Sequence, residues 1–461
     1  MRYTFQHLFI TSAAVASVLA VPAAAQQPLS RELPERWLYT EAVEQTLPAD
    51  DAWWREFDDP VLDSLISLGQ DANYEIGMAM HRMEAARREI QVARAGYFPT
   101  VGLSGGYDRT RTDGVAVSTW SAQATASWEL DIFGRVRANV NLQKHTYRAS
   151  RAEWVGTQVS VASEIASTYI QLRIWQAQLA VAEAHISRQD TIAGLADTRF
   201  ECGLASKIDV DQARGILYST RATVPALHAS IRSAVNSLGL LTGRYASELE
   251  PLLGSYTGLP DYRRIIAAGI PADLLRRRPD VVQAEEQLAA AAASVGIAKK
   301  DFLPTLAING SIGWQSHGHG KFMTGDNLTY SIAPTLSWTV FDGLARKARV
   351  SAAREQQEAL VDSYNYTVMN AYNEVDNALI SYTEAIRSIA DYSRAADTAR
   401  EFLTLSLNLY TQGLSDFTNV ANAQVSYLEY ANSLIAARGK ALTALVNIYR
   451  ALGGGFSSNL Q

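Results

Sequence analysis

Residues that could carry chemistry are sparse in this 461-residue chain. The seven histidines are scattered, and the sequence contains no His-Glu-x-x-His, Gly-x-Ser-x-Gly or phosphate-binding-loop pattern. His317-Gly318-His319 could bind a metal weakly, but it lies between two strand-like segments, where a solvated loop is the better interpretation. We therefore expect no enzymatic activity, no cofactor and no metal centre.

The single cysteine, Cys202, excludes a disulfide framework and cysteine-based zinc or iron-sulfur sites. A lone thiol of this kind is typically a small buried side chain, and we expect Cys202 to be buried. A redox or crosslinking role is the alternative.

More informative are two segments in which a glycine is followed by small and then polar residues. The positions of interest are Gly203, Leu204, Ala205, Ser206 and Asp209 in the first segment, and Tyr410, Gly413, Leu414, Ser415, Asn419 and Asn422 in the second. Glycine readily adopts the left-handed conformation that ends a helix, and Ser206 or Ser415 could cap the helix that follows. The helix dipole would also favour Asp209 and Asp211 near a helix N-terminus.

These segments belong to an internal duplication with a period of about 210 residues. Phe98-Pro99-Thr100 returns as Leu303-Pro304-Thr305, and Ser127-Trp128 returns as Ser337-Trp338. Each copy runs from a helix into two alternating strands and then into a long helix that turns sharply and comes back. A unit of this shape cannot bury its own surfaces, so the duplication predicts several copies closed into a ring.

Four segments of about ten residues alternate between apolar and polar side chains. The clearest is 119–130, whose even-numbered residues from Trp120 to Leu130 are tryptophan, alanine or leucine and whose odd-numbered residues are polar. Such segments have the length of a tilted strand that crosses a bilayer, with aromatic residues near their ends. A soluble amphipathic sheet packed on the helices is the alternative, because it would show the same alternation.

If these strands span a membrane, the chain must oligomerise, because a bilayer tolerates no open sheet edge. Two chains would supply eight strands, and side chains fill the interior of an eight-stranded barrel. Three chains would supply twelve strands and a wider lumen. The strand count therefore predicts a homotrimer as the smallest ring that conducts.

The helices after the strands are unusually long. From Leu344 to Gln412 the sequence has neither glycine nor proline, so a single helix of ~100 Å is permitted at ~1.5 Å per residue. Small and apolar residues recur along it at spacings of three and four, as in a coiled-coil seam. A helix of this length attached to a membrane strand must project far from the bilayer.

The first 25 residues are typical of a secretory signal peptide, with Arg2 before an apolar run that ends at Ala23-Ala24-Ala25. A membrane anchor helix is the alternative, although the run is shorter than the ~20 residues that a span needs. No cysteine follows the expected cleavage site, so we do not expect an N-terminal lipoprotein. The net charge of -6 gives no sign of a nucleic-acid partner.

These patterns divide the chain into five parts. They are a signal peptide at 1–25; an N-terminal extension and first repeat at 26–242 (strands near 100–109 and 119–130, long helix near 135–200, return helix near 207–242); a linker at 243–272, which we expect to lie against the long helices partway along; a second repeat at 273–452 (strands near 305–315 and 328–340, long helix near 344–412, return helix near 416–452); and a tail at 453–461.

Several motifs together resemble one known family. They are Trp53-Trp54-Arg55-Glu56-Phe57-Asp58-Asp59-Pro60, Leu274-Leu275-Arg276-Arg277-Arg278-Pro279-Asp280-Val281, the two Pro-Thr strand starts and both glycine turns. With them, nearly all of the mature chain resembles the outer membrane efflux proteins of the TolC superfamily, in particular the OprM-like and NodT-like outer membrane factors. The Arg276–Arg278 cluster itself most simply makes structural ion pairs or caps.

The resemblance implies a mixed α+β fold, in which a homotrimer forms a twelve-stranded transmembrane β-barrel continuous with a long periplasmic α-helical barrel. It places the protein in the bacterial outer membrane, projecting into the periplasm, with outer membrane lipid around it. It implies a periplasmic adaptor and an inner-membrane pump of the resistance-nodulation-division type as partners. The implied function is a passive exit duct for small molecules such as drugs.

The resemblance also implies roles for the glycine turns. Gly203, Leu204, Ala205, Ser206, Gly413, Leu414 and Ser415 match the adaptor-contact tip, and Tyr410 and Asp209 match the periplasmic gate. Relatives narrow the gate with acidic residues six and nine positions after the second glycine, whereas this chain has Asn419 and Asn422 there. Asparagine rings can hydrogen-bond without charge, so we expect a gate that is less selective for cations.

Two alternatives to an efflux duct stay open, one of them another kind of channel and the other not a channel. An outer membrane channel for type I protein secretion would share the strands and the long helices. A non-conducting structural protein that spans the envelope would not need the polar strand faces. The sequence does not identify the transported molecule.

Overall fold

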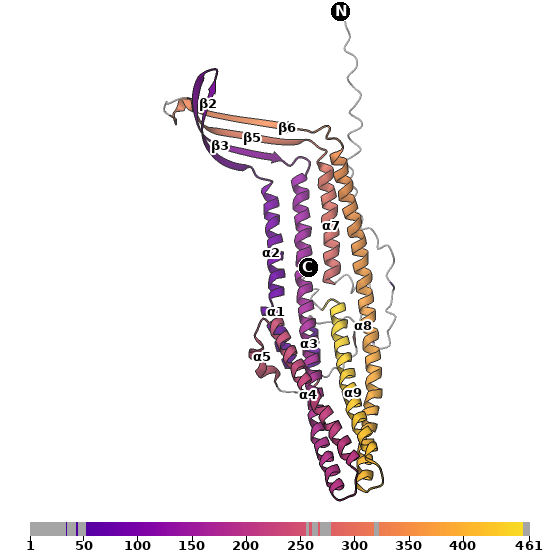
Figure 1. The fold of residues 1–461 in the computed structure, drawn as a ribbon. Coiled ribbons are helices and arrows are strands. Elements are labelled where there is room, and N and C mark those ends of the chain that lie inside the picture. Colours follow the sequence, from indigo (N-terminus) through magenta and orange to yellow (C-terminus); the bar gives the residue numbers. More distant parts are fainter. Residues whose placement is uncertain are drawn as a thin grey trace, which may run out of the picture.

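The computed structural model describes residues 34, 43–44, 52–254, 258–260, 266–267, 278–317 and 322–454. The expected signal peptide and the tail beyond Gly454 lie outside these residues. Figure 1 shows a long bundle of helices with a β-sheet that projects sideways from one end.

Two helices of 67 residues run the length of the bundle: α3, Arg135–Glu201, and α8, Ala345–Thr411. At ~1.5 Å per residue each is ~100 Å long. Each turns at the end far from the sheet and returns as a 35-residue helix, α4 (Lys207–Leu241) or α9 (Phe417–Ala451). Among the described residues, no helix is long and apolar enough to cross a bilayer.

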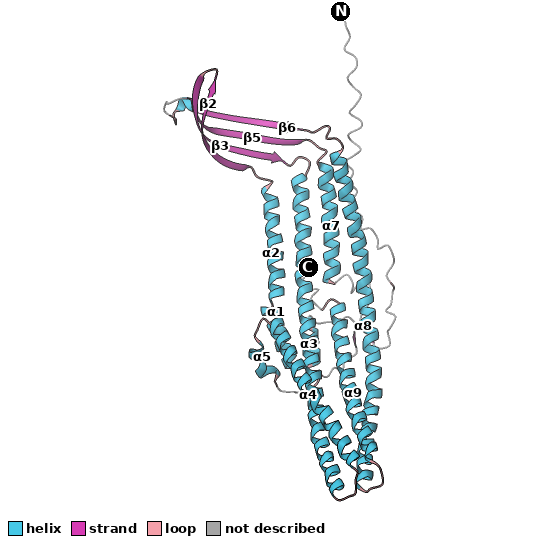
Figure 2. Cartoon of the chain, in the orientation of Figure 1, coloured by secondary structure: helices cyan, strands magenta, loops and turns pink. Residues whose placement is uncertain are grey.

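The return helices α4 and α9 end partway along the bundle. Shorter helices fill the remaining length up to the sheet (Figure 2). Helix α1 (Pro60–Ala72) leads into α2 (Tyr74–Ala95), and the Asn73 side chain between them donates to the carbonyl of Leu241 at the end of α4 (2.9 Å). Helix α7 (Pro279–Lys300) meets the end of α9, where Arg278 donates to the carbonyl of Ala451. These contacts join the upper and lower halves of the bundle.

Arg278 makes the second junction an ion-pair network. Its guanidinium lies 2.7 Å from the carboxylates of both Asp280 and Glu374. Burial opposes the charge on Arg278, but hydrogen bonds and charge from these two carboxylates outweigh burial and raise its pKa. The expectation that the arginine cluster makes structural ion pairs is confirmed for Arg278, whereas Arg276 and Arg277 lie outside the described residues.

Around the two junctions lies the largest hydrophobic core. Trp53 stacks on Tyr449 of α9 (centroids 5.2 Å apart), and Tyr169 of α3 donates to Asp59 (2.6 Å). The short helix α5, Ala246–Leu253, packs against α4 and contributes Leu249 and Leu253 to the core. The 3-10 helix η2, Trp53–Phe57, contributes Trp53 and Phe57 to the same core. A separate two-stranded sheet pairs β1 (Val43–Glu44) with β4 (Ile266–Ala267) in parallel.

The sheet has the strand order β2-β3-β5-β6, with all neighbours antiparallel. Its strands are β2, Thr100–Thr112; β3, Val115–Leu130; β5, Thr305–His317; and β6, Leu328–Ser337, which follows the 3-10 helix η3, Gly325–Asn327. The register aligns the two repeats, because Ala124 of β3 lies between Leu103 and Ile312. The apolar sets of all four strands therefore share one face.

This apolar face is exposed. Leu103 is 86% exposed and Ile332 is 77% exposed, and the sheet projects away from the helices instead of packing on them. A soluble sheet normally buries such a face, so the exposed apolar surface marks a site of interaction with a nonpolar environment.

The first hairpin is longer than the alternation predicted. Asp113 and Gly114 both have positive φ (51° and 84°), the conformation of a two-residue turn that matches the twist of a hairpin. Because Thr112 pairs with Val115 across this turn, β2 and β3 extend to it instead of ending near residues 109 and 119. Strand β6 ends at Ser337, three residues before the expected end.

Candidate functional site: the helical tip

The two helical hairpins end in turns of the same geometry at the end of the bundle far from the sheet (Figure 1). Gly203 has φ +70° and Gly413 has φ +74°, the left-handed conformation in which a Cβ would be strained. The N–H of Leu204 donates to the carbonyl of Arg199 (2.7 Å), and the N–H of Leu414 donates to that of Leu409 (2.9 Å). Both turns are thus Schellman motifs, which satisfy carbonyls at the ends of α3 and α8.

The return helices are capped differently. Ser206 is the N-cap of α4, and its hydroxyl accepts from the N–H of Asp209 (3.3 Å). The N-cap of α9 is Asp416, which makes no side-chain cap hydrogen bond. Ser415 was therefore wrongly considered a possible cap, because it lies one residue before the capping position and is equivalent to Ala205.

Large apolar side chains point outward at the turns. Leu204 is 66% exposed and Leu414 is 70% exposed, and Phe200 and Leu409 are also exposed. Cys202 is exposed as well, so the expectation of a buried thiol was wrong. The residue is the C-cap of α3, where the turn carries its side chain away from the helical seam.

Directly inside the turns lies a small hydrophobic cluster. Tyr410 is 3% exposed and packs edge-on against Phe417 (ring centroids 5.2 Å apart), with Val210 and Val420 in the same cluster. Because Val210 belongs to the first hairpin and the other three to the second, the cluster joins the two hairpins.

Arg199 makes the main polar contacts between the hairpins. Its guanidinium lies over the Tyr410 ring, 4.9 Å from the centroid, and donates to the carbonyl of Thr411 (2.8 Å). The sequence patterns did not identify this residue. Comparison of the repeats could have found it, because the equivalent position in the second hairpin is Leu409.

Asp209 has two contacts at once. One carboxylate oxygen accepts from the Ser206 hydroxyl (2.8 Å), and the other lies 3.5 Å from the Tyr410 hydroxyl, at the limit of a hydrogen bond. Burial raises the pKa of Tyr410, and the negative charge of Asp209 raises it further. Asp209 therefore lies in the first turn of α4, where the dipole favours it, and also contacts Tyr410.

Asn419 and Asn422 are both exposed and lie three residues apart on α9, which puts them on neighbouring positions of one helix face. The Asn419 amide donates to the Ser415 hydroxyl (2.9 Å), and this bond holds the side chain back against the turn. The structure therefore brings Tyr410 and Asp209 together, whereas Asn419 contacts Ser415 and Asn422 is exposed.

The two hairpins differ next to these residues. In the first, Arg214 of α4 pairs with Asp197 of α3 (3.0 Å), and Arg221 pairs with Asp190 (2.9 Å). At the positions equivalent to Asp197 and Arg214, the second hairpin has Leu407 and the buried Gln424. The Arg214–Asp197 ion pair therefore links the helices of the first hairpin where uncharged residues occupy the second.

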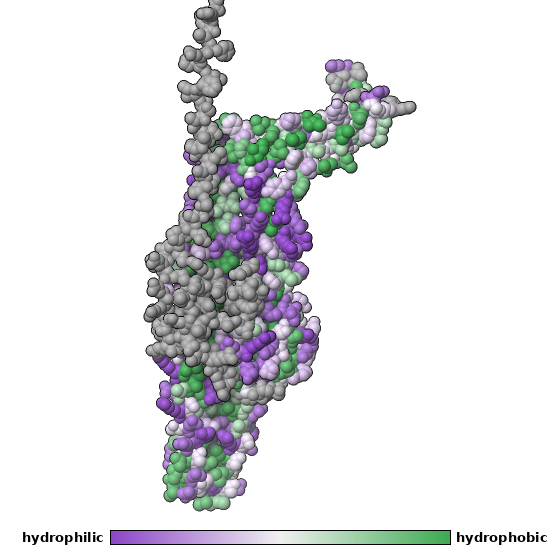
Figure 3. All heavy atoms as spheres, turned by 180° about the vertical axis from the view of Figure 1, so that it is seen from behind, coloured by the Kyte–Doolittle hydropathy of each residue, from purple (hydrophilic) through white to green (hydrophobic). Residues whose placement is uncertain are grey.

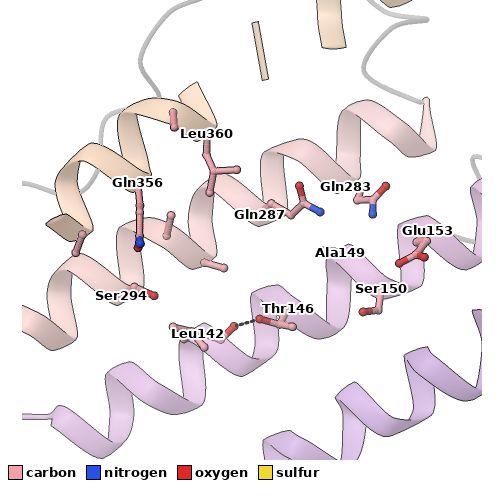
Figure 4. A pocket seen from close by; sticks show the side chains of 14 residues that line it. Leu142, Thr146, Ala149, Ser150, Glu153, Gln283, Gln287, Ser294, Gln356 and Leu360 are labelled. Atoms are coloured by element: carbon pink, nitrogen blue, oxygen red, sulfur yellow. Dashed lines mark hydrogen bonds between the residues drawn. The ribbon is translucent and has the colours of Figure 1, made fainter. Parts of the chain in front are cut away.

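A groove lies in the upper bundle between α3, α7 and α8. It has a volume of about 610 Å³ and is lined mostly by alanine and uncharged polar side chains. Figure 4 shows Gln283, Gln287 and Gln356 around it, with Thr146 and Glu153 on α3. This arrangement offers no constellation for catalysis.

Of the two histidines in the His317-Gly318-His319 motif, the structure describes the first. His317 ends β5, and His319 lies outside the described residues. Among the described residues, no group of three or more His, Cys, Asp or Glu side chains could hold a metal ion.

Comparison with known proteins identifies the family. The model of the outer membrane efflux protein family matches residues 65–244 and 270–454, which correspond to the two repeats. The chain is 31% identical over 440 residues to nodulation protein T of Rhizobium leguminosarum bv. viciae, covering 94% of this chain and 90% of the relative. It is 28% identical to the antibiotic efflux pump outer membrane protein ArpC of Pseudomonas putida, covering 94% and 91%.

Solved structures agree with these relatives. The outer-membrane channel OprN superposes with a TM-score of 0.85 at 28% identity, covering 93% of this chain and 98% of that one. The open state of the Neisseria gonorrhoeae MtrE outer membrane channel shares the fold, with a TM-score of 0.82 at 23% identity, covering 93% and 97%. This chain is therefore a protein of the bacterial outer membrane, and it belongs to the outer membrane efflux protein family.

Proposed function

We propose that this protein is the outer membrane exit duct of a tripartite efflux pump and that it works as a homotrimer. Small molecules such as drugs pass through it passively, from an inner-membrane transporter and a periplasmic adaptor to the outside. One observation carries the proposal: a sheet whose register gathers all apolar side chains on one exposed face is attached to helices of ~100 Å that lead away from it.

The sheet edges support a closed ring of three chains. Strands β2 and β6 are the outer strands of the sheet, and their free backbone groups need partners inside a bilayer. Pairing β2 of one copy with β6 of the next satisfies both edges. Three copies give twelve strands and a lumen, and the polar strand faces, which include Ser104, Gln123 and Ser311, line it with hydrogen-bonding groups.

The tip is the proposed contact with the adaptor. Gly203, Leu204, Ala205, Ser206, Gly413, Leu414 and Ser415 form this surface, in which two rigid turns each present an exposed leucine. An apolar side chain on a fixed turn is a suitable anchor for a pocket on a partner.

The proposed gate lies just above the tip. Tyr410 and Asp209 hold the two hairpins together, and Asn419 and Asn422 narrow the passage when three copies meet. Asparagine rings carry no charge, so this gate attracts cations less than rings of carboxylates would. Asn422→Asp should raise the cation selectivity in single-channel recordings, and unchanged selectivity and cation block would overturn this assignment.

Drug susceptibility tests the proposed function in cells. A strain that lacks this protein should become more sensitive to drugs that the cognate pump exports, and the wild-type gene should restore resistance. A variant with Leu204→Glu and Leu414→Glu should be made and inserted normally but should not restore resistance, because it removes both apolar anchors. Gln412→Glu is the matched control, since it adds a charge beside the same turn without removing an apolar side chain. Full resistance with the double variant would contradict the proposed adaptor contact.

A further inference from the structure

Four exposed cations lie at the sheet-side ends of the four upper helices. They are Arg94 of α2, Arg137 of α3, Lys299 of α7 and Lys347 of α8, which we call the basic collar. The duplication relates them in pairs, with Arg94 equivalent to Lys299 and Arg137 equivalent to Lys347. The same charge therefore occurs at the same level in both repeats.

Neighbouring basic residues form ion pairs or hydrogen bonds within the chain, whereas the collar residues form no ion pair among the described residues. Arg135 forms a forked ion pair with Glu129 (2.7 Å), and Lys300 donates to the carbonyl of Gly134 (2.6 Å). Arg346 pairs with Asp342. Within the described part of the chain, none of the four collar residues forms an ion pair.

Two nearby carboxylates, Asp131 and Asp342, bind backbone groups at the starts of α3 and α8. Asp131 accepts hydrogen bonds from the backbone N–H groups of Val136 and Arg137 at the start of α3. Asp342 accepts from the N–H of Arg346 in addition to the ion pair. Both carboxylates keep their charge in these bonds and, with Glu129 and Asp301, offset part of the local positive charge, but the four collar residues together with Arg135, Lys300 and Arg346 outnumber them.

The helix dipole favours Arg94 and Lys299, which lie in the last turns of α2 and α7, but it does not favour Arg137 and Lys347. Cations are unfavourable near a helix N-terminus, yet α3 and α8 have basic residues and no acidic residue in their first turns. Other helices begin with an acidic residue, as with Glu75 in the first turn of α2, Asp209 in that of α4 and Asp280 in that of α7. Arg137 and Lys347 thus lie at equivalent positions of the two repeats where their own helices do not favour them, which indicates a function for their charge.

The collar lies just below the apolar face of the sheet. The indole N–H of Trp128 donates to the carbonyl of Tyr97 (3.0 Å), and that of Trp338 donates to the carbonyl of Phe302 (3.1 Å). These two indoles mark the lower border of the apolar face. Arg94 and Lys299 precede Tyr97 and Phe302 by three residues each.

Arg137 and Lys347 are each the third residue of their helix, so all four cations lie within about one helical turn, ~5 Å, of the border. The headgroup layer of a bilayer leaflet is ~5–8 Å thick. Figure 3 shows hydrophilic side chains gathered over the helices directly beneath the sheet. The cations therefore lie at the depth of the headgroups when the apolar face lies in the hydrocarbon core.

We propose that the basic collar binds anionic phospholipid headgroups of the periplasmic leaflet. This inference rests on the proposed function, because it requires the sheet to span the membrane. Around a trimer the collar provides twelve cations, which fix the depth of the duct by pairing with phosphodiester groups. Each cation near an anionic surface favours it by roughly five-fold, or ~1 kcal/mol.

Quenching of tryptophan fluorescence by brominated lipids tests the proposal. The full-length protein carries Trp120→Phe and Trp314→Phe, so that Trp128 and Trp338 report from the base of the sheet. It is reconstituted in vesicles that contain brominated phosphatidylglycerol or brominated phosphatidylethanolamine. The collar variant carries Arg94→Gln, Arg137→Gln, Lys299→Gln and Lys347→Gln. The matched control carries Arg188→Gln, Arg354→Gln, Arg438→Gln and Lys440→Gln, which removes equal charge at exposed positions farther from the sheet.

The wild type and the control should bind phosphatidylglycerol about five-fold more strongly than phosphatidylethanolamine, and 0.5 M salt should remove most of this preference. The collar variant should show no preference, whereas a variant that exchanges Arg and Lys at the four positions should keep it. Equal quenching by both lipids in the wild type, or an intact preference in the collar variant, overturns the proposal. If the collar variant does not fold, the wild-type preference and its salt dependence decide the question.

The same experiment separates this proposal from the proposed function. Quenching by both lipids without a preference shows that the sheet lies in the bilayer and that the collar alone has been misassigned. An absence of quenching by either lipid means that the sheet does not enter the bilayer, and both proposals then fail.

Discussion

Replacing Arg199 with alanine should loosen the tip more than any other single side-chain truncation at the turns. The guanidinium makes one charge-assisted hydrogen bond, to the carbonyl of Thr411, and one contact with the face of Tyr410. Such a hydrogen bond contributes ~1.5–3 kcal/mol when shielded, and a cation-π contact contributes ~0.5–1 kcal/mol at an exposed site.

The expected loss is smaller than this sum, because Arg199 is only half buried and its buried Nε has no partner among the described residues. We therefore expect Arg199→Ala to favour separation of the hairpins by about 1–2 kcal/mol. This corresponds to a shift of roughly five- to thirty-fold in the equilibrium between closed and open tips.

Single-channel recording in planar bilayers measures this shift as an increase in open probability. Arg199→Lys should lie between the wild type and the alanine variant, because lysine keeps the charge but loses the planar fork. Tyr410→Phe should have a smaller effect than Arg199→Ala, since the Tyr410 hydroxyl lies 3.5 Å from Asp209. Arg400→Ala is the matched control, because among the described residues Arg400 forms an ion pair only with Asp397, on the surface of its own helix. Equal open probability for Arg199→Ala and Arg400→Ala would refute this account of the tip.

Three further predictions concern the helical bundle. Burial lowers the pKa of His185 from 6.5 to about 4, so the neutral side chain suits the folded state and stability is highest above pH 6.5. As the pH falls from 6.5 toward 4, the free energy of unfolding should drop by up to about 3 kcal/mol. His185→Gln should flatten the thermal stability measured across that range. Arg278→Ala should lower the free energy of unfolding by about 2–3 kcal/mol, measurable as earlier thermal unfolding, because it breaks a buried network at the junction of two helices. A Cβ at Gly439 would clash with Cδ1 of Ile174, so Gly439→Val should destabilise the packing of α9 on α3 by about 1–3 kcal/mol in the same assay. Adding Ile174→Ala should recover part of the loss.

Periodicity alone predicted the main elements of the fold. The alternation around Trp120 and the unbroken helical stretch after Leu344 correspond to β3 and α8, because a period is a local property of the sequence. The match of the two repeats also placed Gly203 and Gly413 at the turns, since a left-handed position strongly selects glycine.

Contacts between the hairpins were not predictable in the same way. Arg199 and Thr411 are separated by 212 residues, and their contact depends on how two long helices align at their far ends. The exposure of Cys202 depends on the side to which the turn carries one side chain, which no pattern of apolar residues specifies. The error for Ser415 arose because the cap position depends on the exact residue at which α9 begins.

The central claim is that three copies of this chain form one conducting duct. The most direct test combines native mass spectrometry of the detergent-solubilised, full-length protein with conductance of the same preparation in a planar bilayer. We expect a trimer of the mature chain and discrete conductance steps, which become larger and longer when Arg199→Ala loosens the tip. A stable monomer or dimer that inserts into the bilayer, or a trimer that never conducts even with the loosened tip, would contradict the claim.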